Sequence, residues 1–309
     1  MKEFSINNVL APIDFSPTSM NALGAAIAIA RKHEATLSII HVIENTSFLY
    51  TKGGGLSAIA LLPELLNTAT EQLKDVASRV RQLHPHLNVR QALMTGHAVE
   101  AICQEADREN ADLVVLGSQG KNNLKELFIG TTAYYVVKSS PVPVLTIPAD
   151  NQWLDFRKIL FPVRERSNSF EKYEFIRPII RKEGSSVSLA GIINKNNPQS
   201  HFQVEHTMEE IYNQLVRDEV VCGTHFYECK NLARQVLEIA EIEKPDLIVI
   251  TTTTETSIWD VFSAPFSKDV VNHSHFPVLS IRPRLEIEAQ LKAVRYVDER
   301  LGSPTIAFN

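Results

Sequence analysis

The chain contains an internal repeat, and this feature restricts its fold more than any other. Residues 110–147 align without a gap to residues 244–281, and each residue of the first segment lies 134 positions before its counterpart. The opening segments 7–14 (NNVLAPID) and 157–164 (RKILFPVR) also match. A repeat of this length is the signature of one structural unit present twice. The 309-residue chain is therefore expected to hold two copies of one domain.

Within each copy, short apolar runs typical of strands alternate with helical patterns. In the first copy the expected strands cover residues 7–14, 35–44, 87–96, 111–116 and 141–147, and the expected helices cover 17–33, 63–83, 97–110 and a short stretch between Gly130 and Pro141. The second copy keeps this order, with one helix that ends near Gly184 and another over 205–217. Such alternation indicates right-handed β-α-β crossovers and a parallel sheet with helices on both faces. The predicted fold class is α/β, with two tandem doubly wound domains.

The repeat also sets the expected domain boundaries. The first domain is expected over residues 1–148, a linker over 149–157 and the second domain over 158–283. The remaining tail, 284–309, has a pattern compatible with one amphipathic helix, and its role cannot be read from the sequence.

Charge and composition argue against several classes of function. The formal net charge is −5 and neither half of the chain is basic, so nucleic-acid binding is not expected. The longest apolar stretch near the start, LGAAIAIA, is far shorter than the ~20 residues of a membrane span, and the first residues lack a signal-peptide pattern. We therefore expect a cytoplasmic protein without a membrane segment.

The cysteines do not predict a metal site. The chain has three cysteines and no CxxC motif, so neither a disulfide framework nor a zinc site is expected. Cys222 and Cys229 bracket His225, but the alternation of polar and apolar residues around them favours a strand.

The segment 117–132, GSQGKNNLKELFIGTT, carries the chemistry of the first copy. Gly117 ends a strand, and Gly130 opens a helix. Glycine lets backbone N–H groups approach a ligand closely, and a helix N-terminus adds unpaired donors and the positive end of its dipole. This combination predicts a phosphate site.

The spacing of this segment resembles that of a known family. A glycine, two residues, a glycine, nine residues and then glycine with serine or threonine is the pattern of nucleotide-binding universal stress proteins, met here by Gly117, Gly120, Gly130 and Thr131. From about residue 6 to residue 283, the chain resembles a tandem universal stress protein. The resemblance implies two five-stranded parallel sheets of order 3-2-1-4-5, and in such a sheet the ligand crevice opens at the carboxyl ends of the first and fourth strands.

The resemblance also implies a ligand, ATP with Mg²⁺, and a set of site residues. Asp14 and the backbone of Val42 would hold the adenosine end, and Leu116 and Gly117 would lie against the base and ribose. The phosphates would accept hydrogen bonds from the backbone N–H groups of Gly120, Gly130, Thr131 and Thr132 and from the Thr131 hydroxyl. Each residue has another reading: Asp14 as a capping carboxylate, Val42 as a core residue and the glycines as turn residues. Lys121 could reach a phosphate or lie solvated in a loop.

The second copy lacks these residues. Gly117, Gly120, Gly130 and Thr131 correspond to Thr251, Thr254, Ala264 and Pro265, and Asp14 corresponds to Arg164. Threonine side chains would crowd the phosphate position, and proline has no N–H to donate. We expect no ATP in this half, with recognition of a different anion by Arg164 and the threonines as the alternative.

These observations favour an ATP-binding, nucleotide-dependent regulatory module of a stress response, with an unknown protein partner. The segment offers no base or metal cluster for hydrolysis, and the chain has no GxxxxGK[ST] or GxSxG motif, so an enzyme is not expected. A partner-binding scaffold with structural or absent nucleotide is the main alternative. The apolar fifth strands of the copies invite pairing, which would make a pseudo-dimer within one chain. A homodimer of chains is also compatible with the sequence.

Overall fold

The computed structural model describes residues 4–44, 55–118, 130–149, 155–165, 168–197, 199–252 and 266–282. The first half contains the strands β1 (Asn8–Pro12), β2 (Thr36–Glu44), β3 (Val89–Gly96), β4 (Leu113–Gly117) and β5 (Val144–Ile147), with the helices α1 (Pro17–His33), α3 (Gly55–Leu83), α4 (Ala98–Arg108) and α5 (Thr131–Ser139). The second half contains β6 (Lys158–Arg164), β7 (Ser186–Asn194), β8 (Cys222–Cys229), β9 (Leu247–Thr251) and β10 (Val278–Ile281), with α6 (Ser169–Glu183), α7 (Gln199–Arg217), α8 (Leu232–Glu243) and α9 (Phe266–His273). The predicted alternation of strands and helices is confirmed.

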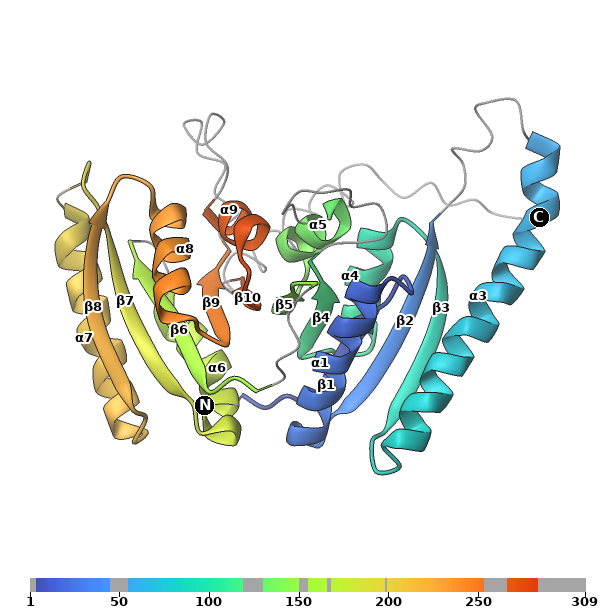
Figure 1. Cartoon of the computed structure of the whole chain (residues 1–309), viewed down its shortest axis with the longest axis horizontal. Helices are drawn as coiled ribbons and strands as arrows, with labels where there is room; N and C mark the ends of the chain where they lie inside the picture. The colour runs from blue at the N-terminus through green and yellow to red at the C-terminus, as the bar shows by residue number, and fades with distance from the viewer. Residues whose placement is uncertain are drawn as a thin grey trace, which may run out of the picture.

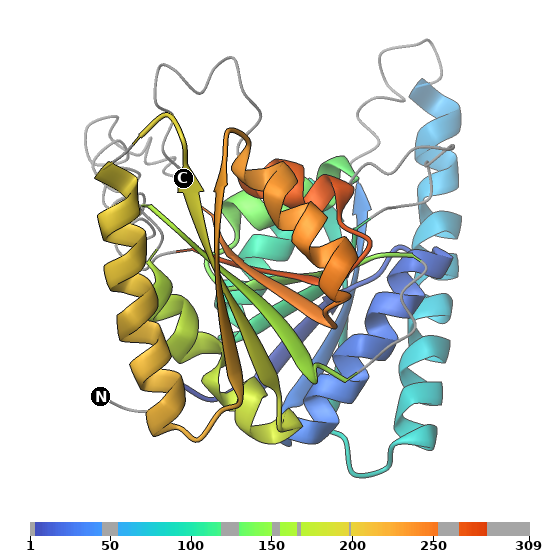
Figure 2. The ribbon, with the colours of Figure 1, turned by 60° about the vertical axis from the view of Figure 1, so that its left-hand side comes forward.

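All ten strands form one sheet in the order β3-β2-β1-β4-β5-β10-β9-β6-β7-β8 (Figures 1 and 2). Within each half the neighbouring strands are parallel, and the order in each half is 3-2-1-4-5, as predicted. β3 and β8 are the two outer edges of the sheet.

The two halves meet where β5 pairs with β10 in antiparallel direction. In this pair Leu145 lies opposite Leu279, and the two leucines are counterparts in the sequence repeat. An approximate two-fold axis therefore passes through this leucine pair. The Thr146 hydroxyl adds a hydrogen bond to the carbonyl of Val278, with an oxygen–oxygen distance of 3.2 Å. The expected pairing of the fifth strands is thus present within one chain.

Helices cover both faces of the sheet. Successive side chains of a strand point to opposite faces, so Val9 of β1 belongs to a core cluster that includes residues of α1, α3, α6 and α7, whereas Leu10 belongs to the cluster with α4 and α5. The first of these clusters runs through both halves of the molecule. Phe4 joins the halves there, because its ring centroid lies 4.3 Å from that of Phe175 on α6.

Several helix ends follow directly from the sequence. Ser16 caps α1, since its hydroxyl accepts a hydrogen bond from the N–H of Ser19 at 3.2 Å, and Pro17 is the first helical residue. Gly184 ends α6 with a φ of 63°, a left-handed conformation that glycine adopts without strain.

Two helices begin earlier than the sequence indicated. α3 starts at Gly55, eight residues before Pro63, which lies inside the helix. A proline inside a helix removes one hydrogen bond, but the strong helix formers on both sides of Pro63 extend the helix past it. α7 starts at Gln199 rather than 205, because Val204 is fully buried against the sheet and its packing favours the additional turn.

Candidate functional site at the strand tips

The fold brings the predicted site residues of the first half to one edge of the sheet. β1 pairs with β4 through Val9 and Leu113, so Asp14 and Gly117, at the carboxyl ends of these strands, lie at the same edge. Val42 lies near the carboxyl end of β2, the other neighbour of β1. Gly120 and Lys121 fall outside the described residues.

Asp14 stabilises the turn between β1 and α1. Its carboxylate accepts a hydrogen bond from the N–H of Ser16 at 3.0 Å, and its own N–H donates to the Ser19 hydroxyl at 3.2 Å. This is the capping role that the sequence left open for Asp14. A carboxylate offers about four acceptor positions, so it can accept more than one hydrogen bond.

The sequence analysis missed two residues at this turn, Phe15 within it and His41 on the neighbouring strand β2. Phe15 has a φ of 62°, a left-handed conformation that is costly for a residue with a side chain. Its ring centroid lies 4.6 Å from that of His41, and the His41 Nδ1 lies 2.7 Å from the carbonyl oxygen of Ile13. These contacts hold the turn in its conformation. The only sequence signal for a role of His41 was its position directly before Val42.

Gly117 is required by packing. A Cβ atom at Gly117 would lie 2.8 Å from Cγ2 of Thr18 and 3.1 Å from its backbone, so only glycine allows α1 to approach the tip of β4 this closely. Leu116, directly before it, is buried in the core under α4 and α5. Val42 packs against the same core cluster.

α5 begins at the tip of β4. Gly130 is its N-cap, and the N–H of Gly130 donates to the carbonyl of Ser118 at 2.6 Å. Thr131 and Thr132 are the first two helical residues, and the N–H groups in the first turn of a helix have no partner within it. Among the residues that the structure describes, neither of these two N–H groups donates a hydrogen bond to a backbone carbonyl. The first turn contains no acidic residue, so its positive dipole end faces no carboxylate of its own.

In the second half, one side chain crosses the corresponding tip. Arg164 stands at the end of β6, and its Nη2 donates to the carbonyl of Thr251 at 3.3 Å. Its guanidinium carbon lies 4.3 Å from the ring centroid of Phe266, the first residue of α9, as in a cation–π contact. Thr251 and Phe266 are the counterparts of Gly117 and Thr132. Arg164 therefore connects the positions that form the candidate site in the first half.

A second cation lies next to Arg164. Lys172 is fully buried, and its Nζ donates to the carbonyl of Pro162 and lies 3.9 Å from the ring centroid of Phe161. Burial, and then the nearby Arg164 guanidinium, hold the pKa of Lys172 well below its usual value. Arg164 and Lys172 stand where the first half has Asp14 and Ala22, so the residue at the strand tip changes from acidic in the first half to basic in the second. Thr254, Ala264 and Pro265 lie outside the described residues.

Comparisons with known proteins identify the first half. Residues 5–148 match the universal stress protein family. This half of the chain belongs to that family. A universal stress protein of Methanocaldococcus jannaschii is 29% identical over 154 residues, which cover 46% of this chain and 95% of that protein. Universal stress protein A homolog 1 of Coxiella burnetii is 27% identical over 140 residues, or 45% of this chain and 94% of that protein.

Solved structures extend the similarity in fold to both halves. The crystal structure of a universal stress protein from Archaeoglobus fulgidus has a TM-score of 0.70 at 18% identity and covers 90% of this chain and 97% of that chain. A putative universal stress protein from Pseudomonas aeruginosa has a TM-score of 0.65 at 17% identity, with 94% and 97% covered. At these identities the likeness establishes the fold. The universal stress protein fold is therefore present twice along the chain.

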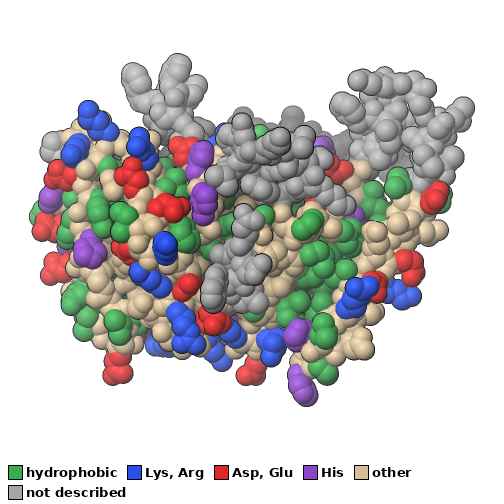
Figure 3. All heavy atoms as spheres, viewed as in Figure 1, with side chains coloured by type: hydrophobic (Ala, Val, Ile, Leu, Met, Phe, Trp, Pro, Cys, Tyr) green, Lys and Arg blue, Asp and Glu red, His purple; other side chains and the backbone are tan. Residues whose placement is uncertain are grey.

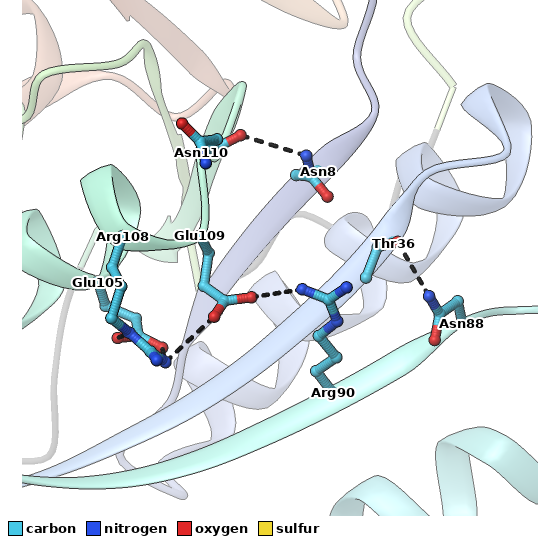
Figure 4. A network of polar contacts seen from close by, with 8 residues as sticks. All are labelled: Asn8, Thr36, Asn88, Arg90, Glu105, Arg108, Glu109 and Asn110. Carbon is cyan, nitrogen blue, oxygen red and sulfur yellow. Dashed lines mark hydrogen bonds and ion pairs between the residues drawn. The ribbon is translucent and has the colours of Figure 1, made fainter.

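The polar network in Figure 4 lies at the opposite edge of this universal stress protein domain, at the amino ends of its strands. Arg90 pairs with Glu109 at 2.7 Å, and Arg108 pairs with Glu105 at 2.6 Å. Arg90 is 56% exposed, so solvent screens its pair with Glu109, whereas Glu105 is only 4% exposed and accepts hydrogen bonds from two nitrogens of Arg108. Hydrogen bonds from the Asn8 side chain to the Asn110 carbonyl and from the Asn88 side chain to the Thr36 hydroxyl complete the network. Its role is to tie the turns at the amino edge together.

The surface and the cysteines of the universal stress protein fold add no further candidate site. Acidic and basic side chains lie intermingled over the described part of the face in Figure 3. Within the described ranges, no group of three or more His, Cys, Asp and Glu side chains could hold a metal ion, and no helix is long and apolar enough to cross a membrane. Cys222 and Cys229 are free thiols at the two ends of strand β8, with pKa values raised by burial.

Proposed function

We propose that this chain is an ATP-binding regulatory module of the universal stress protein family, with one nucleotide site at the strand tips of the first half. The observation that carries the proposal is the meeting of three features at one edge: the Asp14 turn, the glycine end of β4 and the Gly130 start of α5. Such an edge, at the reversal of strand order, is where doubly wound sheets bind ligands.

The residues divide between the two ends of the ligand. Asp14 and the main chain of Val42 would hold the adenosine end, with Leu116 and Gly117 against the base and ribose. The N–H groups of Thr131 and Thr132 and the Thr131 hydroxyl would bind the phosphates, because the first turn of α5 offers donors and a positive dipole end. Mg²⁺ would accompany the phosphates. Gly120 is assigned to the phosphates by its place in the motif.

The second half is proposed to bind no nucleotide. Arg164 spans the corresponding strand tips through its contacts with Thr251 and Phe266, which supports this assignment. One nucleotide per chain is therefore expected. We assign the halves to residues 1–148 and 158–283, with a linker over 149–157 and a tail over 284–309.

Binding without turnover is the expected activity. Hydrolysis requires a base or orienting group near the γ-phosphate, and Asp14 is assigned to the nucleoside end. The nucleotide then acts as a signal that changes the state of the protein rather than as a substrate. We propose that this role is regulatory, in a stress response, and that the protein acts in the cytoplasm.

Native mass spectrometry and calorimetry test the proposal on the full chain. We expect one ATP per chain in the wild-type protein, bound with Mg²⁺. Gly130→Val should abolish binding, since the side chain would fill the phosphate position, while the φ of −59° at Gly130 allows valine to fold normally. Ala264→Val makes the corresponding change in the second half and is the matched control. Two nucleotides per chain, or unchanged affinity in Gly130→Val, would contradict the site assignment.

A partner-binding scaffold is the second candidate, and two observations favour it. The N–H of Gly130 already donates to Ser118, and the Asp14 carboxylate already accepts from Ser16, so both groups have partners without a ligand. Under this hypothesis no ATP co-purifies, and millimolar ATP does not raise the melting temperature. The ATP hypothesis requires Gly130 to exchange its bond with Ser118 for a phosphate, or to leave the phosphates to Thr131 and Thr132.

A further inference from the structure

Arg282 links the second half of the chain to the helix that opens at the candidate site. It follows β10 directly and is only 6% exposed. Its Nη1 donates a hydrogen bond to the carbonyl of Ser140 at 3.3 Å, across 142 positions of sequence. Ser140 is the C-cap of α5 and is itself buried. A cation from the second half therefore contacts the carboxyl end of a helix in the first.

α5 is short, so its two ends are closely coupled. It has nine residues, Thr131–Ser139, and the last carbonyl groups of a helix have no partner within it. A cation at this end satisfies a carbonyl and interacts favourably with the helix dipole. A change at Ser140 is thus transmitted along little more than two turns to the N-terminal N–H groups.

A second contact from the second half also reaches α5. The Nζ of Lys268, on α9, lies 5.2 Å from the ring centroid of Tyr134, the fourth residue of α5. The two helices lie next to each other at the centre of the molecule (Figure 1). The charge of Arg282 also acts on Cys103 of α4, where it opposes the rise in thiol pKa, to about 11, that burial causes. The guanidinium is therefore close to both helices on this face of the first half.

The support is not reciprocal. The counterpart of Arg282 in the repeat is Pro148, which has neither a cationic side chain nor an N–H group. Pro148 therefore cannot make with α9 the contact that Arg282 makes with α5. This difference between the counterpart positions parallels the proposed asymmetry of the sites.

We propose that Arg282 is a positioning residue for the phosphate-binding end of the ATP site: it fixes the carboxyl end of α5, and thereby aims the N–H groups of Thr131 and Thr132. This inference rests on the proposed function. It assigns a role to the second half, which contributes a support for the site rather than a site of its own.

The test compares two ligands on the full chain, ATP with Mg²⁺ and adenosine, by calorimetry. Arg282→Gln removes the cation and should weaken ATP binding about fivefold, the effect of one favourable helix-dipole contact, while adenosine affinity stays within error. Arg282→Lys keeps the charge but loses the planar fork, so its affinity for ATP should lie between those of the wild type and Arg282→Gln. If Arg282→Gln fails to fold, the Arg282→Lys variant still tests the proposal.

Thr146→Val is the matched control, because it removes a hydrogen bond at the same junction of the halves and leaves the contact between Arg282 and Ser140 in place. It should lower stability and leave the ratio of the two affinities unchanged. Equal losses for ATP and adenosine in Arg282→Gln, or no loss, would overturn the positioning role while the ATP site stands. A wild-type chain that binds neither ligand would remove the proposed function, and this inference with it.

Discussion

At the scale of single residues, packing alone is sufficient to require a glycine at the tip of β4. Gly117 belongs to the glycine pattern that suggested a phosphate site, yet its closest neighbour is Thr18 of α1. In the second half Thr251 takes its place, and α6 begins at Ser169, two positions later in the repeat than Pro17 of α1. A side chain at the strand tip thus accompanies a later start of the helix above it.

Gly117→Ala tests this packing directly. The added methyl would lie 2.8 Å from Cγ2 of Thr18, so we expect a loss of about 1–3 kcal/mol in the free energy of unfolding, measured by denaturant titration. Thr18→Ser removes that methyl group and should recover part of the loss in the double variant. A double variant no more stable than Gly117→Ala alone would show that the backbone contact at 3.1 Å, and not Cγ2, sets the cost.

At the scale of elements, corresponding helices of the two halves are joined at their carboxyl ends. The Nζ of Lys32, on α1, lies 2.7 Å from the carboxylate of Glu183, on α6, and 2.6 Å from that of Asp155. The Glu183 side chain is only 5% exposed, so this contact is better shielded than an ordinary surface pair. His33 lies beside it, where burial, then Lys182 and Lys32, lower the pKa of His33 to about 4.

This junction should weaken in acid. A histidine whose pKa is about 4 in the folded chain and about 6.5 in the unfolded chain binds its proton mainly after unfolding, so stability is lost as pH falls from about 6.5 to about 4. His33→Gln should reduce the difference in unfolding free energy between pH 7 and pH 5, measured by urea titration. The same exchange at the exposed His86 is the control and should leave that difference unchanged. An unaltered pH dependence in His33→Gln would exclude His33 as its source.

At the scale of the whole molecule, the antiparallel β5–β10 pair joins two parallel sheets into one. The apolar character of the fifth strands predicted this pairing, and its register places Leu145 against Leu279 on the approximate two-fold axis. Both leucines are almost completely buried, at 2% and 1% exposure. The hydrophobic core on this face therefore continues from one half to the other.

Leu145→Ala and Leu279→Ala should each cost about 2–5 kcal/mol of unfolding free energy, because each opens a cavity at the same junction. Because the two leucines occupy equivalent positions of the repeat, we expect similar losses of unfolding free energy, although the residues lie in different halves. The double variant should lose less than the sum, with a coupling of at least about 0.5 kcal/mol, since opposed residues of a strand pair share their contact. Strictly additive losses in thermal or urea unfolding would show that the two leucines stabilise their halves separately.

The sequence by itself determined the architecture and the start of the candidate site. The repeat indicated two copies, the alternation of patterns indicated the parallel sheets, and Gly130 marked the beginning of α5. These features depend on local periodicity and on conformational preferences of single residues, which a sequence carries directly. The predicted start of α3 was wrong for the same reason, because the prediction treated Pro63 as a local helix boundary.

Only the tertiary structure decided which distant residues meet. Thr18 lies against Gly117, Arg164 reaches Phe266, and Arg282 contacts Ser140, and none of these pairs is close in sequence. Each depends on how helices settle on the sheet and how the halves join, and close packing resolves such contacts only when the whole chain is in place. The proposed role of the second half as a support for α5 therefore depends on a contact that only the tertiary structure shows.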